Sequence, residues 1–315
     1  MRILFMGTPD FAVFSLKALV EAGEDTTVIG VVTQPDKPRG RGYDLAPPPV
    51  KVYAQEHGLP VYQPTTLRGD DFAALLAELD PELIVVVAYG KILPKNVLDY
   101  PKHGCINVHG SLLPAYRGAA PMQRAIIDGC AVTGITTMYM AEGLDTGDML
   151  LKSEVAIEQN DNFEDIHDRL GAVGADTLLR TIDALRAGAL VPEKQDDALA
   201  TYAAKIDKAD CLLNFSHCAR ALHDRIRGLS PIPLAFTHTP DGKLLKILAA
   251  RVSDLPCPDG VAVGTVLSLD GGEIVVACGN ATTLALTRVL PEGKGRMPAA
   301  DFIRGRKIAV GDVLQ

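Results

Sequence analysis

The 315-residue sequence contains no tryptophan, and aromatic residues make up only 5% of it. It also lacks any apolar run close to the roughly 20 residues that a membrane-spanning helix needs. The first residues, Met1 to Gly7, hold one basic side chain and a short apolar stretch, followed by Thr8-Pro9-Asp10. That start is typical of a strand and a turn, and differs from a secretory signal. We therefore expect a cytoplasmic protein with no membrane contact.

The cysteines and histidines lack the spacings that mark metal or redox sites. The closest cysteine pair, Cys211 and Cys218, is seven residues apart, which is too loose for a standard zinc knuckle or redox motif. The turn Gly7-Thr8-Pro9 is not the Gly-x-Gly-x-x-Gly of dinucleotide-binding proteins. The sequence therefore predicts free thiols, no metal site and no nicotinamide cofactor.

Length and charge indicate two parts. A chain of 315 residues exceeds the usual size of one compact domain, and 47% hydrophobic residues suffice for a real core. The net charge of −8 is unevenly divided, with −11 in residues 1–204 and +3 in residues 205–315. This asymmetry has two interpretations, a basic binding surface in the second part or chance surface variation.

The first half alternates short apolar runs with helical patterns, which is typical of a parallel sheet with crossover helices. Leu83–Ala88 is apolar at every position, as in a central strand covered on both faces. We predict an α/β domain over residues 1–189 with a mostly parallel sheet. Its expected strands are 2–6, 28–33, 83–88, 105–109, 134–141 and 150–157, and its expected helices include 11–22 and 162–187.

The second part has a different pattern. Residues 190–207 are polar and are predicted to form a linker. After it, one helix at about 216–227 precedes short strands, and Asp270-Gly271-Gly272 is a hairpin signal between two of them. Residues 208–315 are therefore predicted to form a small β-barrel. Its expected strands are 234–238, 244–252, 261–269, 273–277 and 284–290.

Residues 34–49 form an unusual segment after the second strand. They contain five prolines, two glycines and three basic side chains, a composition for which we predict no regular element. A loop of this length inside a compact domain is usually functional or disordered.

Asn107 and His109 begin the segment richest in chemistry. They are two residues apart on a predicted strand and so point to the same face. An amide there can stabilise a developing oxyanion while an imidazole handles the proton. A lone histidine on an apolar strand is more often structural. The neighbouring asparagine, together with Gly110 and Gly118, which permit close approach of a ligand, favours the catalytic interpretation.

Asp145 lies in a second polar turn, Leu144-Asp145-Thr146-Gly147. An ordinary turn is the plain interpretation of its aspartates. Asp-Thr-Gly also occurs in aspartic proteases, but this chain has one copy and lacks their all-β start, which argues against that class. A carboxylate brought beside His109 would orient the ring and stabilise its protonated form.

Taken together, Asn107-x-His109, the strip from Ser111-Leu112-Leu113-Pro114 to Tyr116-Arg117-Gly118, and Leu144-Asp145-Thr146-Gly147 resemble the folate-dependent formyltransferase family. Phe5–Ala12 and the loop from Thr33 to Gly42 are most similar to the members that formylate initiator methionyl-tRNA. The resemblance covers nearly the whole chain. It implies a Rossmann-like formyltransferase domain followed by a small barrel of the oligonucleotide-binding (OB) type that binds tRNA.

The resemblance also implies roles for single residues. Asn107, His109 and Asp145 would be catalytic, with 10-formyltetrahydrofolate as formyl donor and initiator methionyl-tRNA as acceptor of a monomeric enzyme. The implied folate contacts are Ser111, Leu112, Leu113 and Pro114, with Tyr89, Gly90 and Ile92. Those to the acceptor stem are Lys37, Arg39 and Arg41. Candidate phosphate contacts in the second domain are Lys243, Lys246, Arg251, Arg304, Arg306 and Lys307.

Family members carry tryptophans near the start of the second domain, where this sequence has Phe215 and Ser230-Pro231-Ile232-Pro233.

Formyltransferases of the same fold that act on glycinamide ribonucleotide or on amino-sugar nucleotides are the nearest alternative. Residues 208–315 argue against the purine enzyme, which usually stops near the end of the first domain. A folate hydrolase, or a nucleic-acid-binding module without catalysis, is the alternative from another class.

Overall fold

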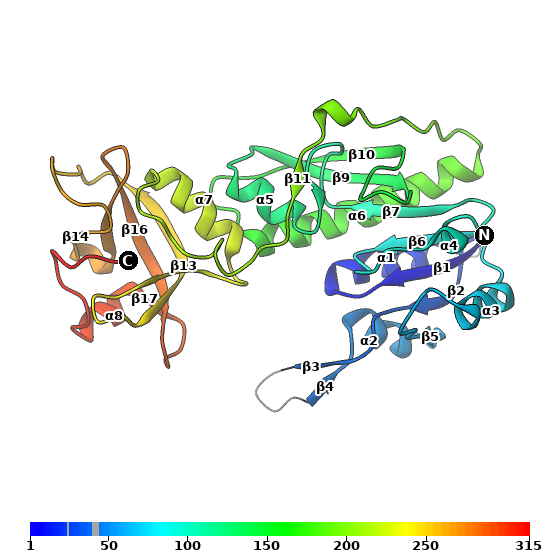
Figure 1. Ribbon diagram of the computed structural model, residues 1–315, viewed down its shortest axis with the longest axis horizontal. Helices are drawn as coiled ribbons and strands as arrows, with labels where there is room; N and C mark the ends of the chain where they lie inside the picture. The colour runs from blue at the N-terminus through cyan, green and yellow to red at the C-terminus, as the bar shows by residue number, and fades with distance from the viewer. Residues whose placement is uncertain (24, 40–43) are drawn as a thin grey trace. The chain divides into compact units, whose positions relative to one another are not determined.

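The computed structural model describes residues 1–23, 25–39 and 44–315, which divide into two compact units (Figure 1). The second unit takes two short segments from earlier in the chain in addition to its C-terminal part. The first unit consists of Met1–Gly118, Val132–Ala156 and His167–Ala203. The second consists of Ala119–Ala131, Ile157–Ile166 and Ala204–Gln315. The domain boundaries at residues 189 and 208 stay a prediction.

A seven-stranded sheet in the order β10-β9-β7-β6-β1-β2-β5 forms the centre of the first unit. Neighbours among β1, β2, β5, β6 and β7 run parallel, whereas β9 is antiparallel to both β7 and β10. The α/β class with a mostly parallel sheet is thus confirmed. The strands are β1 (Arg2–Gly7), β2 (Thr27–Val32), β5 (Val61–Tyr62), β6 (Leu83–Val87), β7 (Cys105–His109), β9 (Val132–Tyr139) and β10 (Met149–Ala156).

Helices cover this sheet, and β6 is buried at every position, as its unbroken apolar run predicts. Helix α6 (Phe163–Arg186) packs on one face of the sheet, and its contacts show to which face each side chain of β7 points. A side chain at Gly174 of α6 would lie 3.2 Å from Val108 and 3.4 Å from Ile135. Because neighbouring residues of a strand point to opposite faces, Asn107 and His109 point away from α6. The other helices of the sheet are α1 (Asp10–Glu21), α2 (Pro49–Glu56), α3 (Asp70–Leu79) and α4 (Lys95–Leu98).

The expectation that residues 34–49 form no regular element was wrong in part. Strands β3 (Lys37–Arg39) and β4 (Asp44–Ala46) pair antiparallel, and residues 40–43 between them lie outside the described residues (Figure 1). An isolated two-stranded ribbon tolerates Pro38 because a strand with a free edge need not use every backbone N–H. The base of this hairpin is fixed by Lys51, whose Nζ donates to Asp36 at 2.7 and 2.8 Å.

The second unit is built around an antiparallel sheet in the order β12-β13-β16-β15-β14, with β17 paired to β16. The predicted strands are present, although β14 is shorter than expected, and the turn Asp270–Gly272 joins β14 to β15. Phe215 is 4% exposed in the core. The elements are α5 (Pro121–Ile127), α7 (Ala219–Leu229), β12 (Ala235–His238), β13 (Leu244–Ser253), β14 (Val266–Ser268), β15 (Ile274–Cys278), β16 (Thr282–Pro291), β17 (Met297–Pro298) and α8 (Ala299–Arg304).

The six cysteines are free thiols, three of them buried. In the described part of the chain, no helix combines the length and the apolar character that crossing a bilayer would take. Nor does that part hold a cluster of three or more side chains suited to binding a metal ion.

Candidate active site

His109 is the last residue of β7, and its side chain is only 6% exposed. Its Nε2 lies 3.0 Å from the carbonyl oxygen of Tyr116. Because a carbonyl oxygen only accepts, Nε2 carries a proton, and Nδ1 is left to gain or lose one. Nδ1 lies 3.7 Å from Oδ2 of Asp145. The structure thus brings these two predicted residues together, and a proton taken up at Nδ1 would lie beside a carboxylate.

Asp145 reaches His109 from the far end of β7. The antiparallel strand β9 ends at Tyr139, which pairs with Ile106 near the start of β7, so the loop after β9 must run back along that strand. Gly147 makes this path possible, since a Cβ there would lie 1.8 Å from the carbonyl oxygen of Tyr139. The sequence suggested a turn at this place but gave no sign of its direction.

Two further groups complete the arrangement around His109. Oδ2 of Asp145 accepts the backbone N–H of Gly118 at 2.8 Å, which fixes the carboxylate to the loop after β7. Asn107 is half-buried, and within the described residues the structure records no hydrogen bond of its side chain. Its amide is therefore free to donate to an oxygen of a bound substrate on the face that also carries His109.

The strip Ser111–Pro114 lies directly after His109. The Ser111 hydroxyl donates to the carbonyl oxygen of Ala115 at 2.6 Å, and Leu113, 1% exposed, packs against two methionines of β9 and β10. Both side chains are thus occupied within the protein. Folate contacts of this strip would come from its backbone and from Leu112 and Pro114, which are half-buried.

The loop after β6 supplies the other predicted folate residues. Tyr89 is 2% exposed, and burial raises the pKa of its phenol to about 12. Its carbonyl oxygen accepts from Thr8 Oγ1 at 3.0 Å and from Gln34 Nε2 at 3.1 Å, which joins the ends of β1, β2 and β6. Open α/β sheets bind ligands at such an edge. Gly90 and Ile92 face outward, and Ile92 is 80% exposed, so an apolar surface is available there.

Sequence reasoning missed the role of residues 193–203, here called the strap. Met149 and Glu193 exchange backbone hydrogen bonds of 2.8 Å, and β11 (Tyr202–Ala203) pairs with β8 (Arg117–Gly118). Between them, Thr201 accepts the N–H of Tyr116 on its hydroxyl at 2.8 Å. The strap therefore contacts both loops that carry the candidate catalytic groups. Its polar composition gave no local signal of these long-range contacts.

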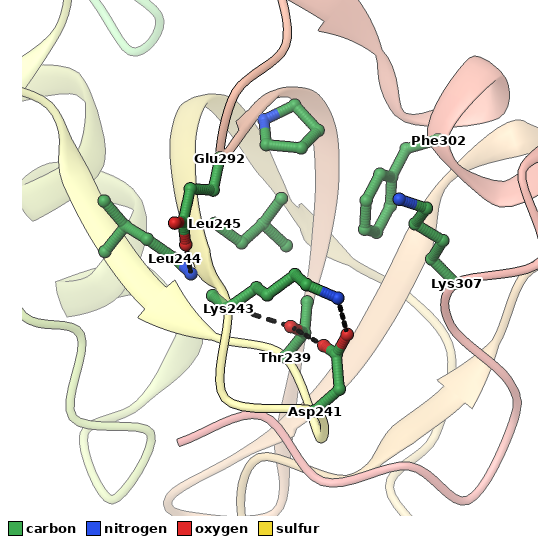
Figure 2. A pocket seen from close by; sticks show the side chains of 9 residues that line it. Thr239, Asp241, Lys243, Leu244, Leu245, Glu292, Phe302 and Lys307 are labelled. Atoms are coloured by element: carbon green, nitrogen blue, oxygen red, sulfur yellow. Dashed lines mark hydrogen bonds and ion pairs between the residues drawn. The ribbon is translucent and has the colours of Figure 1, made fainter.

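Of the predicted tRNA contacts in the hairpin, Lys37 is exposed on β3, Arg39 ends that strand, and Arg41 lies outside the described residues. In the second unit, a hollow of about 20 Å³ is lined by Asp241, Lys243 and Lys307, among others, whose side chains are drawn in Figure 2. That volume holds roughly one water molecule, so it does not fit a folate.

Several basic side chains of the second unit are already neutralised. Lys243 donates to Asp241, as Figure 2 shows, and this bond, together with one from Thr239, lowers the pKa of Asp241 to about 2. The other two pairs are Arg251 with Glu273 and Arg304 with Asp301. Among the described residues, Lys246, Arg306 and Lys307 have no such acidic partner, which separates them from the rest of the predicted set.

Two family models match the chain. One, described as formyl transferase, matches residues 1–182, and the other, described as formyl transferase, C-terminal domain, matches residues 205–307. Relatives named methionyl-tRNA formyltransferase match over almost the full length. One from Geotalea daltonii is 49% identical over 311 residues, covering 99% of this chain and 97% of the relative. One from Bacillus subtilis is 49% identical over 313 residues, with the same shares.

The fold is also similar to that of a solved N-formyltransferase from Helicobacter canadensis, in complex with folinic acid and dTDP-3-aminofucose. The TM-score is 0.64 at 17% sequence identity, and the match covers 90% of this chain and 98% of the other. At this identity the likeness concerns the fold alone.

Proposed function

Because the chain belongs to the methionyl-tRNA formyltransferases, we propose that it transfers the formyl group of 10-formyltetrahydrofolate to the α-amino group of initiator methionyl-tRNA. The observation that carries the assignment of the site is the placement of His109 Nδ1 beside the Asp145 carboxylate, with the Asn107 amide on the same face. We assign these three residues as the catalytic groups.

The attacking amine must be neutral, and its nitrogen becomes positively charged as it bonds to the formyl carbon, so one proton has to leave it during or after attack. In our proposal, Nδ1 of His109 takes that proton, directly or through a water molecule, and the neighbouring carboxylate of Asp145 stabilises the resulting imidazolium. Nε2 stays bonded to the Tyr116 carbonyl in both protonation states. That bond keeps the ring in one orientation throughout the reaction.

Attack makes a tetrahedral oxyanion, which the Asn107 amide and the charged imidazole would stabilise. When the bond between the formyl carbon and N10 breaks, the proton held by His109 returns to the leaving nitrogen, and tetrahydrofolate departs. A covalent formyl-enzyme is not part of this proposal. The Ser111 hydroxyl, two residues after His109, donates to a carbonyl oxygen and not to a base.

For the two substrates we propose separate surfaces. The folate would lie against the strip Ser111–Pro114 and the loop carrying Tyr89, Gly90 and Ile92, where Ile92 exposes apolar surface after β6, the strand next to β7. The acceptor stem would contact Lys37, Arg39 and Arg41, with residues 208–315 holding the rest of the tRNA as an OB-type domain after a linker at 190–207. We further propose that the protein acts as a monomer in the cytoplasm.

A panel assay tests the function. The protein is incubated with formyl-labelled 10-formyltetrahydrofolate and, separately, initiator methionyl-tRNA, glycinamide ribonucleotide, an amino-sugar nucleotide or water. We expect label to appear on the methionyl-tRNA and in none of the other products. Equal transfer to an amino-sugar nucleotide, or release of formate without an acceptor, would contradict the proposal.

A further inference from the structure

Gln195, in the strap, is bonded to the loop that carries Asp145. Its Nε2 donates to the carbonyl oxygen of Asp145 at 2.8 Å and to that of Gly147 at 2.7 Å. Its Oε1 accepts from Nε of Arg117 at 2.9 Å. The orientation of the amide follows from its partners, because carbonyl oxygens only accept and a guanidinium only donates.

Arg117 bonds a second residue of the strap in addition to Gln195. Its side chain is 2% exposed, and its Nη2 is 2.8 Å from Oδ1 of Asp197, which also belongs to the strap. A buried guanidinium is costly unless its charge is paired and its N–H groups are bonded. The need to satisfy Arg117 therefore keeps the strap against the loop after β7, and with it the side chain of Gln195.

Asp145 needs such support. Its backbone has φ of 51°, in the left-handed region that a residue with a side chain seldom adopts without surrounding contacts. The N–H of Gly118 binds the carboxylate of Asp145, whereas the side chain of Gln195 binds the backbone carbonyls of Asp145 and Gly147. Without Gln195, the middle of the loop would lose both backbone bonds, and the position of the carboxylate would depend on the Gly118 N–H alone.

We infer that Gln195 is a positioning residue for the formyl transfer, which holds the Asp145 carboxylate over Nδ1 of His109. This inference rests on the catalytic roles proposed above. Gln195 acts through Asp145 and takes no part in proton transfer itself. A displacement of about 1 Å at a reacting group costs on the order of 100-fold in rate, so an indirect residue in this place has a measurable effect.

The test compares Gln195→Ala and Gln195→Glu with Glu193→Gln, a control in the same strap whose side chain is exposed. Gln195→Glu keeps an oxygen for Arg117 but has no N–H groups for the two carbonyls. We expect both Gln195 variants to lose about 10- to 100-fold in kcat, with KM for both substrates nearly unchanged. The control should keep wild-type kcat. A Gln195→Glu variant with wild-type kcat would overturn the inference.

A double-mutant cycle separates positioning from a merely structural role. If Gln195 acts through Asp145, Gln195→Glu made in an Asp145→Asn background should lower kcat by about twofold or less, because the carboxylate it positions is already gone. A full additional loss in that background would mean that Gln195 has another role, and the inference would be wrong. If Asp145→Asn alone kept wild-type activity, the proposed catalytic assignment would fail first, and this inference with it.

Discussion

The loops that carry His109 and Asp145 and the hairpin β3–β4 belong to the same unit and are held in opposite ways. Side-chain bonds tie both loops, to each other through Gly118 and to the strap through Gln195 and Thr201. The hairpin is anchored at its base by Lys51, and beyond that point its described strands pair only with each other. The difference fits the proposed roles, because catalytic groups need a fixed geometry, whereas a segment that contacts a large polymer does not.

The largest effect is expected where the fixed loops meet. His109→Ala should lower turnover by about 10²–10⁴-fold, as loss of a general acid–base group usually does. Asp145→Asn should be comparably damaging because it keeps the shape but removes the charge beside Nδ1. Steady-state kinetics with initiator methionyl-tRNA measure both, and circular dichroism checks the fold. Near-wild-type transfer by either variant would remove the basis of the assignment.

Gly147→Ala tests whether transfer activity depends on the exact position of the loop that carries Asp145. A Cβ would lie 1.8 Å from the Tyr139 carbonyl oxygen, so the loop must shift, and we expect kcat to fall by about 100-fold. Gly295→Ala is the control, because a Cβ there meets nothing within 4 Å. If the first variant kept wild-type kcat, the contrast between fixed loops and hairpin would have no functional meaning.

Arg41→Ala should impair the use of methionyl-tRNA, the formyl acceptor, and leave the binding of formyl-folate, the formyl donor, unchanged. We expect a loss of about 1–3 kcal/mol in the use of methionyl-tRNA, on the scale of one specific nucleic-acid contact, with unchanged affinity for formyl-folate. Separate titration of the two substrates measures each effect. Weaker folate binding with normal tRNA use would assign this residue to the folate site.

Within the second unit, basic side chains with an acidic partner should contribute less to tRNA binding than basic side chains without one. Lys307→Ala should weaken tRNA binding and reduce the slope of log affinity against log salt by about 0.7–0.9, the value for one lost phosphate contact. Lys243→Ala should change the slope less, because Asp241 already neutralises that ammonium. Equal slopes for both variants would contradict the distinction drawn between the two sets of cations.

The smallest effect is expected for the ion pair of His167 with Asp10, which belongs to the first unit and lies outside the two loops. A hydrogen bond with Asp10 raises the pKa of His167, and the same bond lowers the pKa of Asp10. A raised histidine pKa stabilises the fold below its unfolded value of 6.5 and ceases to do so as the pH rises through the folded value. The Asp10 contribution is present above 3.8 and is lost on acidification.

Wild type should therefore exceed His167→Gln in stability most clearly near pH 5–6, by less than about 1 kcal/mol, because Asp10 is largely exposed. The difference should vanish in alkaline solution, with kcat unchanged throughout. Chemical denaturation at several pH values measures it. A constant difference across the whole range would show that the ion pair does not cause it.

Much of the first unit could be predicted because its strands are apolar and periodic. Leu83–Ala88 and Cys105–His109 were placed to within a residue, and the latter placed Asn107 and His109 on one face. The hairpin was missed because a proline- and glycine-rich composition predicts irregularity, while pairing of two short segments depends on their meeting in space. Local pattern contains no information of that kind.

The strap shows the same limit more clearly. Gln195 contacts a loop that lies 48 and 50 residues earlier in the chain, and a single glutamine among polar residues leaves no periodic trace. Arg117 lies between apolar segments of the sequence, and a charged side chain in such a place needs partners if it is buried. The carboxylate of Asp197 is one of those partners.

The antiparallel direction of β9 has a consequence for how the chain can vary in length. Because β9 ends beside the start of β7, the loop that follows must cover a set distance back to His109. One inserted residue adds up to about 3.6 Å of chain, close to the whole separation of 3.7 Å between Nδ1 and Oδ2. Residues 140–148 should therefore tolerate neither insertions nor deletions, whereas the described strands β3 and β4 pair only with each other and hold no catalytic group in place. Among descendants of one ancestral sequence, gaps should accumulate at the hairpin and stay absent from the loop that carries Asp145.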